Sequence, residues 1–107
     1  MKILQIIPRQ RVRLYGAIVK KEVDLARKKK GTFFRAAAKE RNEAKWRHSN
    51  YKGWINLRRG LSEVVMAEIK TIGDSAADEE WKILHAFLGF LDRHFGDQIV
   101  AINIQYR

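Results

Sequence analysis

The sequence predicts an α+β domain in which helices pack on one face of an antiparallel sheet. Two long segments repeat their apolar residues at the spacing of a helix, and several shorter segments rich in valine and isoleucine have the composition of strands. Helical and extended segments alternate along 107 residues, a length that supports one hydrophobic core. We therefore expect a single domain that covers residues 1–107.

The first half begins with an expected strand and an expected helix. Residues 2–7 form a short apolar run with the composition of a strand. Between residues 10 and 30 the apolar residues fall on one half of a helical wheel, and Gly31 is a residue type that commonly ends helices. Residues 32–51 are less regular, because their phenylalanines and alanines form only a weak helical stripe that leaves out Trp46. We expect a loosely docked second helix there, with extended structure as the alternative.

A hairpin is expected next. Residues 54–58 form its first strand, and residues 62–72, which are rich in valine and isoleucine, form its second strand. The turn between them is expected at Arg59 and Gly60.

The last third predicts a long helix and a final strand. Ser75 and Asp78 have the spacing of a capping box, so we expect the helix to begin at Ala76. Its large apolar residues share one face, and Gly96 ends it. Residues 99–106 are apolar on both faces and predict a strand in the centre of the sheet. The resulting order is βαββαβ, as in a ferredoxin-like domain.

Positive charge is concentrated in the first sixty residues. The chain holds 22 lysines and arginines against 12 acids, for a net charge of +10. Residues 1–60 hold 18 of these cations and 4 acids, whereas residues 61–107 hold 4 cations and 8 acids, so the halves carry +14 and −4. A polyanion is the partner that such an asymmetry favours.

Aromatic and cationic residues interleave in the basic half, as they do in proteins that bind single-stranded nucleic acid. Cations neutralise phosphates, and flat rings stack on bases. One group of cations aligns on the helix of residues 10–30, and we call it the helix ridge. The strand expected at 62–72 has no aromatic residue, so we expect contacts from the helix ridge and from residues 33–59 rather than from the open sheet. The candidate nucleic-acid-binding residues are Arg13, Lys20, Arg27 and Lys28 of the helix ridge, and Arg35, Lys45, Trp46, Arg47, His48, Tyr51, Lys52, Trp54, Arg58 and Arg59.

Other readings of the same residues stay open. Trp46, Tyr51 and Trp54 are aromatic residues near expected strand ends, which often pack in a core while neighbouring cations are solvated. Charge complementarity between the two halves favours a homo-oligomeric protein–protein interaction module as an alternative function. His48 within the basic block makes a small basic ribonuclease a second alternative. A basic helix that lies on an anionic membrane surface is a further reading.

Several kinds of site are not predicted. The chain has no cysteine, which removes disulfides and thiolate metal ligands. His85 and His94 are nine residues apart on one expected helix and therefore point to opposite sides of it. There is no glycine-rich phosphate loop or nucleophile elbow. We therefore predict no cofactor, no metal and no catalytic residue, a binding protein rather than an enzyme, no membrane span, and a cytoplasmic location.

Overall fold

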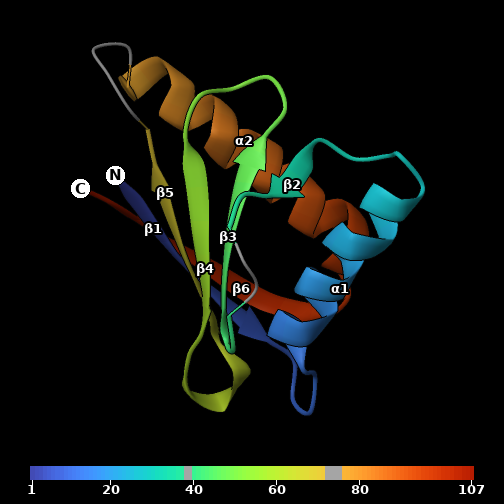
Figure 1. The fold of residues 1–107 in the computed structure, drawn as a ribbon. Coiled ribbons are helices and arrows are strands. Elements are labelled where there is room, and N and C mark those ends of the chain that lie inside the picture. The colour runs from blue at the N-terminus through green and yellow to red at the C-terminus, as the bar shows by residue number, and fades with distance from the viewer. Residues whose placement is uncertain (38–39, 72–75) are drawn as a thin grey trace.

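A six-stranded antiparallel sheet carries two helices on one face in the computed structural model, which describes residues 1–37, 40–71 and 76–107 (Figure 1). The predicted α+β class is confirmed. Along the chain the elements are β1 (Lys2–Pro8), α1 (Leu14–Arg27), β2 (Phe33–Arg35), β3 (Glu43–His48), β4 (Trp54–Arg59), the 3₁₀ turn η1 (Leu61–Glu63), β5 (Val65–Lys70), α2 (Ala76–Phe95) and β6 (Ile99–Tyr106).

The strands lie in the order β2-β3-β4-β5-β1-β6, and every neighbouring pair is antiparallel. The elements β1, α1, β4, β5, α2 and β6 follow one another in the βαββαβ order. The strands β2 and β3 lie between α1 and β4 along the chain and extend the sheet beyond β4. As a result, β2 and β6 are the two edges of the sheet.

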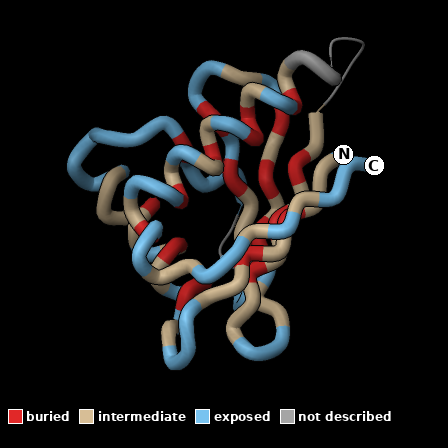
Figure 2. Tube along the Cα trace, turned by 180° about the vertical axis from the view of Figure 1, so that it is seen from behind, coloured by how far each residue is buried: buried red, intermediate tan, exposed pale blue. Residues whose placement is uncertain are grey.

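One face of the sheet is buried beneath the helices. Side chains of neighbouring strand residues point to opposite faces, and alternate residues of the central strands are buried. From α1, Leu14 and Ile18 pack against this face, and from α2, Phe87 and Leu91 do so. Figure 2 shows buried positions on the helices and on the strands beneath them. The buried strand residues are Leu4, Ile6, Phe33, Trp46, His48, Ile55, Leu57, Val65, Ala67 and Ile69. The opposite face of the sheet has no helix against it among the described residues.

The helix α1 ends earlier than the position of Gly31 suggests. Lys29 adopts a left-handed conformation with a φ of 55°. Its N–H donates to the carbonyl of Ala26 at 3.0 Å, and the N–H of Lys30 donates to the carbonyl of Leu25 at 2.8 Å. These two bonds form a Schellman motif, which ends the helix before Gly31 is reached.

Residues 32–51 do not form the second helix that we expected. They form β2 and β3, which pair with Phe33 opposite His48 and Arg35 opposite Trp46. The inward residues of β3 are Trp46 and His48, and the exposed Arg47 lies between them. This alternation has the period of a strand. The segment forms a strand rather than a helix because this alternation places its largest ring, that of Trp46, in the core.

The second hairpin strand and the last strand also differ from expectation. The connection after β4 is longer than the turn expected at Arg59 and Gly60, and β5 begins only at Val65. The strand β6 pairs with β1 and is the outermost strand, so its predicted central position is wrong. The helix α2 begins at Ala76 as expected, whereas the predicted cap at Ser75 lies outside the described residues.

We expect Phe87→Ala to lower the free energy of unfolding by about 3–5 kcal/mol, because it empties a fully buried ring position between α2 and the sheet. Denaturant titration monitored by circular dichroism measures the loss. The matched control is Gly89→Ala on the same helix, where an added Cβ meets no atom within 4 Å. Since alanine favours helices over glycine, that variant should gain about 0.5–1 kcal/mol. Equal effects of the two substitutions would contradict the assigned core.

Candidate nucleic-acid interface

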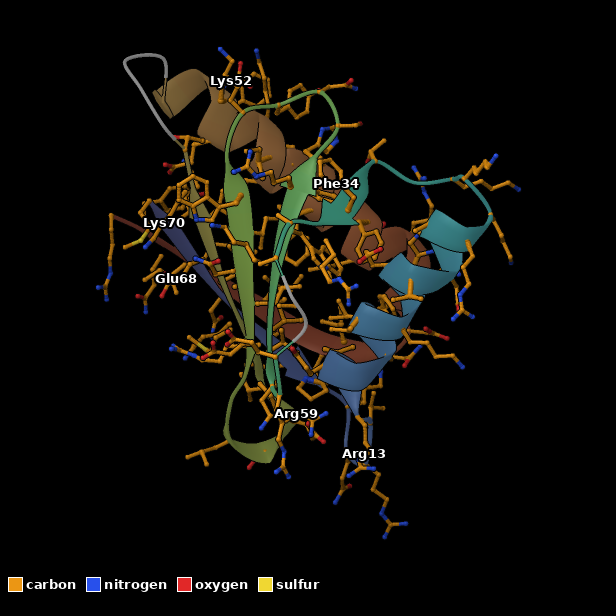
Figure 3. All side chains as sticks on the ribbon, viewed as in Figure 1. Arg13, Phe34, Lys52, Arg59, Glu68 and Lys70 are labelled. Atoms are coloured by element: carbon orange, nitrogen blue, oxygen red, sulfur yellow. The ribbon has the colours of Figure 1, made fainter. Side chains whose placement is uncertain are left out.

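The uncovered face of the sheet carries Lys45, Arg47 and Arg58 from the block of residues 33–59. Because strand side chains alternate, the neighbours of the buried residues point to this face. Figure 3 shows Glu68 and Lys70 of β5 on the side of the sheet away from α1. The same alternation identifies the residues of β2, β3, β4 and β5 whose side chains point to the uncovered face. They are Phe34 from β2, Glu43, Lys45 and Arg47 from β3, Trp54, Asn56 and Arg58 from β4, and Met66, Glu68 and Lys70 from β5.

Strand register brings two aromatic rings and two cations into one row. Phe34 lies opposite Arg47, and Trp54 lies opposite Lys70. Because Trp46 pairs with Ile55, the next position places Arg47 beside Trp54. We call Phe34, Arg47, Trp54 and Lys70 the aromatic–cation row. Neighbouring strands are about 4.8 Å apart, so the row crosses roughly 14 Å of the sheet.

The rings of this row differ in exposure. Phe34 is 45% exposed, a large fraction for a phenylalanine. Trp54 is half-buried, and the ammonium of Lys45 lies 4.5 Å from the centre of its ring. This cation–π contact holds a positive charge beside the row. One exposed ring and several cations are therefore adjacent on the same surface.

Acidic residues interrupt the positive charge on this face. Glu43 lies opposite Arg58, and the carboxylate of Glu68 lies 3.6 Å from the ammonium of Lys70. A cavity of about 360 Å³ opens here, and its lining includes Lys45 and Arg58 together with these two glutamates. The positive surface is thus confined to the end of β3 and β4 that holds Arg47 and Trp54.

The helix ridge of Arg13, Lys20, Arg27 and Lys28 is exposed, but α1 packs on the covered face of the sheet. It therefore does not join the aromatic–cation row in one surface. Arg13 and Arg59 lie at the end of the molecule that holds the β4–β5 connection (Figure 3). Glu63 pairs with both of them, with N–O distances of 3.6 Å to Arg13 and 3.3 Å to Arg59.

Two predicted contact residues are core residues instead. Trp46 is fully buried and packs against Phe33, Phe87 and Phe90, so its ring is not available to a base. His48 is buried, and its ring stacks on Tyr51 with centroids 4.4 Å apart.

The Nδ1 atom of His48 accepts a hydrogen bond from the backbone N–H of Asn50 at 3.0 Å. Burial lowers the pKa of this histidine, which favours its neutral form. His48 therefore supports the β3–β4 turn instead of presenting a cation to a phosphate. Lys52 is exposed on that turn.

Arg35 and Arg59 lie on the covered side of their strands, beside α1. The guanidinium of Arg59 is 5.2 Å from the centre of the Tyr15 ring. Arg35 faces Glu22, a carboxyl that is only 5% exposed. Burial raises the pKa of Glu22, and the positive charge of Arg35 opposes that shift.

A cavity of about 490 Å³ lies between α1 and β3, and its lining includes Glu22, Tyr15 and Trp46. The Nε1 atom of Trp46 is buried and has no hydrogen-bond partner among the described residues. Glu22 is the one acidic residue among the buried residues of α1.

The structure adds Phe34 and Lys70 to the residues chosen from sequence. Phe34 lies in the block of residues 33–59 from which contacts were expected, whereas Lys70 lies on the open sheet, from which contacts were not expected. The strand pairing that places Phe34 beside Arg47 and Lys70 beside Trp54 is not visible in the sequence. Within the described ranges, no group of three or more His, Asp or Glu side chains is placed to hold a metal ion. No described helix combines the length and apolar character that crossing a membrane requires.

The lowered pKa of His48 predicts a stability that depends on pH. Below the ordinary histidine value of 6.5 the unfolded chain takes up a proton that the folded state resists, so stability falls as the pH decreases. We expect His48→Phe, which keeps a ring on Tyr51, to reduce the drop in melting temperature between about pH 7 and pH 5. Burial also lowers the pKa of His94, which accounts for a remaining drop. An unchanged drop in the variant would contradict the assignment.

The raised pKa of Glu22 predicts a contribution to stability that changes with pH in the opposite direction. Its folded state binds a proton more tightly than the unfolded chain, so its contribution to stability is lost as the pH rises above the ordinary value of 4.5. Glu22→Gln should raise the melting temperature at neutral pH, and the gain should shrink towards pH 4.5. Asp24→Asn, which also removes one negative charge from α1, is the control and should show a smaller gain.

No protein-family model matches this chain, and neither the curated proteins nor the solved structures include one that is significantly similar to it. A function for the chain therefore has to follow from the chemistry of its own surface.

Proposed function

We propose that this protein binds single-stranded nucleic acid on the uncovered face of its sheet. The observation that carries the proposal is the aromatic–cation row, in which Phe34, Arg47, Trp54 and Lys70 follow one another across four strands. Rings that can stack on bases and cations that can neutralise phosphates therefore lie next to one another in this row.

The chemistry of the row favours an unpaired strand over a duplex. A ring can stack on a base only when that base is not already stacked inside a helix. Stacking on one aromatic side chain contributes about 1–3 kcal/mol, and each cation that neutralises a phosphate adds a salt-dependent contribution. Phe34 offers the more exposed ring, and Lys45 holds its ammonium beside Trp54, where a phosphate next to a stacked base would lie.

The helix ridge has a different part in this proposal. It lies with α1 on the other side of the sheet, so it cannot contact the nucleotides that occupy the row. Its charge is part of the net charge of +10, which accelerates the approach of a polyanion over a long range. Because the chain has no cysteine and needs no oxidising environment, the cytoplasm is the compartment that we propose.

Fluorescence anisotropy with labelled single-stranded and duplex oligonucleotides tests this proposal. We expect tighter binding of the single strand, and an affinity that falls steeply between about 50 mM and 200 mM salt. Phe34→Ala should weaken single-strand binding by roughly 5- to 150-fold, because it removes one stacking partner, and should leave the salt dependence unchanged. Absence of binding at about 50 mM salt would refute the proposal.

A matched pair of charge variants locates the site. Arg47→Gln and Arg27→Gln each remove one exposed arginine, the first from the row and the second from the helix ridge. We expect Arg47→Gln to reduce affinity more and to lower the slope of log affinity against log salt by about one unit. Equal effects of the two variants would show that binding depends on overall charge and not on the row.

A further inference from the structure

The edge strand β6 lacks most of the features that usually protect a sheet edge, although it has a bulge at Val100, where its pairing with β1 shifts by one residue. Proteins cover such edges with a helix or loop, or place charged residues and prolines on them, because their free backbone groups pair readily with another chain. Ile99–Tyr106 spans eight residues and contains neither a charged residue nor a proline. The other edge, β2, is only three residues long and ends in Arg35.

The backbone groups of β6 that face outward follow from its pairing with β1. The N–H of Arg107 donates to the carbonyl of Met1 at 2.9 Å, and the terminal amine of Met1 donates to the carbonyl of Arg107 at 2.9 Å. In an antiparallel pair such hydrogen-bonded positions alternate, so Gln105 and Asn103 also bond towards β1. The N–H and C=O groups of Ile102 and Ile104 therefore point away from the sheet.

Apolar side chains are exposed along the same edge. Val100 is 58% exposed and Tyr106 is 70% exposed, and both belong to β6. Met1, which pairs with the end of this strand, is also exposed. Exposed apolar side chains beside free backbone groups are a feature of surfaces that bind another protein chain.

We propose that two copies of this chain join through their β6 strands, antiparallel, about a two-fold axis at Ile102. The sheets then form one continuous sheet of twelve strands. Such an interface is isologous, because the same strand serves both subunits. In this register, which follows the regular part of β6 at residues 101–106, Ala101 lies opposite the partner's Asn103.

Charge favours a second copy of the chain as the occupant of this edge. The uncharged strand is flanked by Asp97 before it and Arg107 after it. The same two-fold axis brings the end of β6 that follows Asp97 to the end that carries the partner's Arg107, so residues of opposite charge lie near both ends of the interface. The net charge of +10 opposes association, but much of it lies on α1, β3 and β4, away from β6.

The two-fold axis is perpendicular to the sheet, so both uncovered faces point the same way. If the proposed function also holds, two aromatic–cation rows share one surface, and linked binding at both would raise the apparent affinity. That consequence rests on the proposed function, whereas the dimer does not.

Multi-angle light scattering, in the absence of nucleic acid, tests the dimer. We expect a mass twice the 12.5 kDa of the chain. Ala101→Lys with Asn103→Lys places lysines opposite each other across the interface, and the mass should fall to that of one chain. The matched control is Ala101→Glu with Asn103→Lys, which substitutes the same exposed positions, pairs opposite charges, and should keep the doubled mass. Circular dichroism verifies that both variants fold.

A cross-link tests the position of the axis. Ile102→Cys introduces the only cysteine of the chain, and at the axis it meets its own copy at a distance that suits a disulfide. Oxidation should convert most of the protein to a covalent dimer that reducing agent dissociates. A single-chain mass of the unmodified protein at every concentration, equal masses of the two charge variants, or a dimer that does not cross-link would each overturn the proposal.

Discussion

The burial of one face of the sheet beneath α1 and α2 is the constraint on which the rest of the structure depends. The buried aliphatic and aromatic residues on that face form a continuous cluster with residues of both helices. Each large apolar side chain removed from water contributes on the order of 1.5–3 kcal/mol, so this cluster is the largest favourable contribution to folding. A chain without disulfides relies on it.

The same constraint determines what the other face displays. A strand with Trp46 and His48 in the core must present Arg47 between them to solvent. In β4, burial of Ile55 and Leu57 likewise turns Trp54 outward. The aromatic–cation row is therefore a consequence of the packing beneath it, and a one-residue shift in register would exchange the two faces.

The distribution of charge has a structural origin as well. Arg59 and Arg13 are held at Glu63, and Lys2 and the terminal amine of Met1 are held at Glu80 on α2. These ion pairs partly neutralise Lys2, Arg59 and the terminal amine, whereas the side chain of Arg13 stays 84% exposed. The cations that stay exposed divide between α1 and the uncovered face, because α1 packs on the opposite side of the sheet.

The sequence by itself determined the fold class, α1, β4 and α2, since each of these elements has a local period that matches the face it buries. Only the tertiary structure decided that residues 32–51 form strands, because their helical and extended patterns are of similar strength until Trp46 is packed against α2. It also decided that β6 is an edge strand, since the apolar composition of a strand does not show how many other strands pair with it. For the candidate site, the sequence indicated Arg47 and Trp54, but the contacts that add Phe34 and Lys70 come from strand pairing between distant segments.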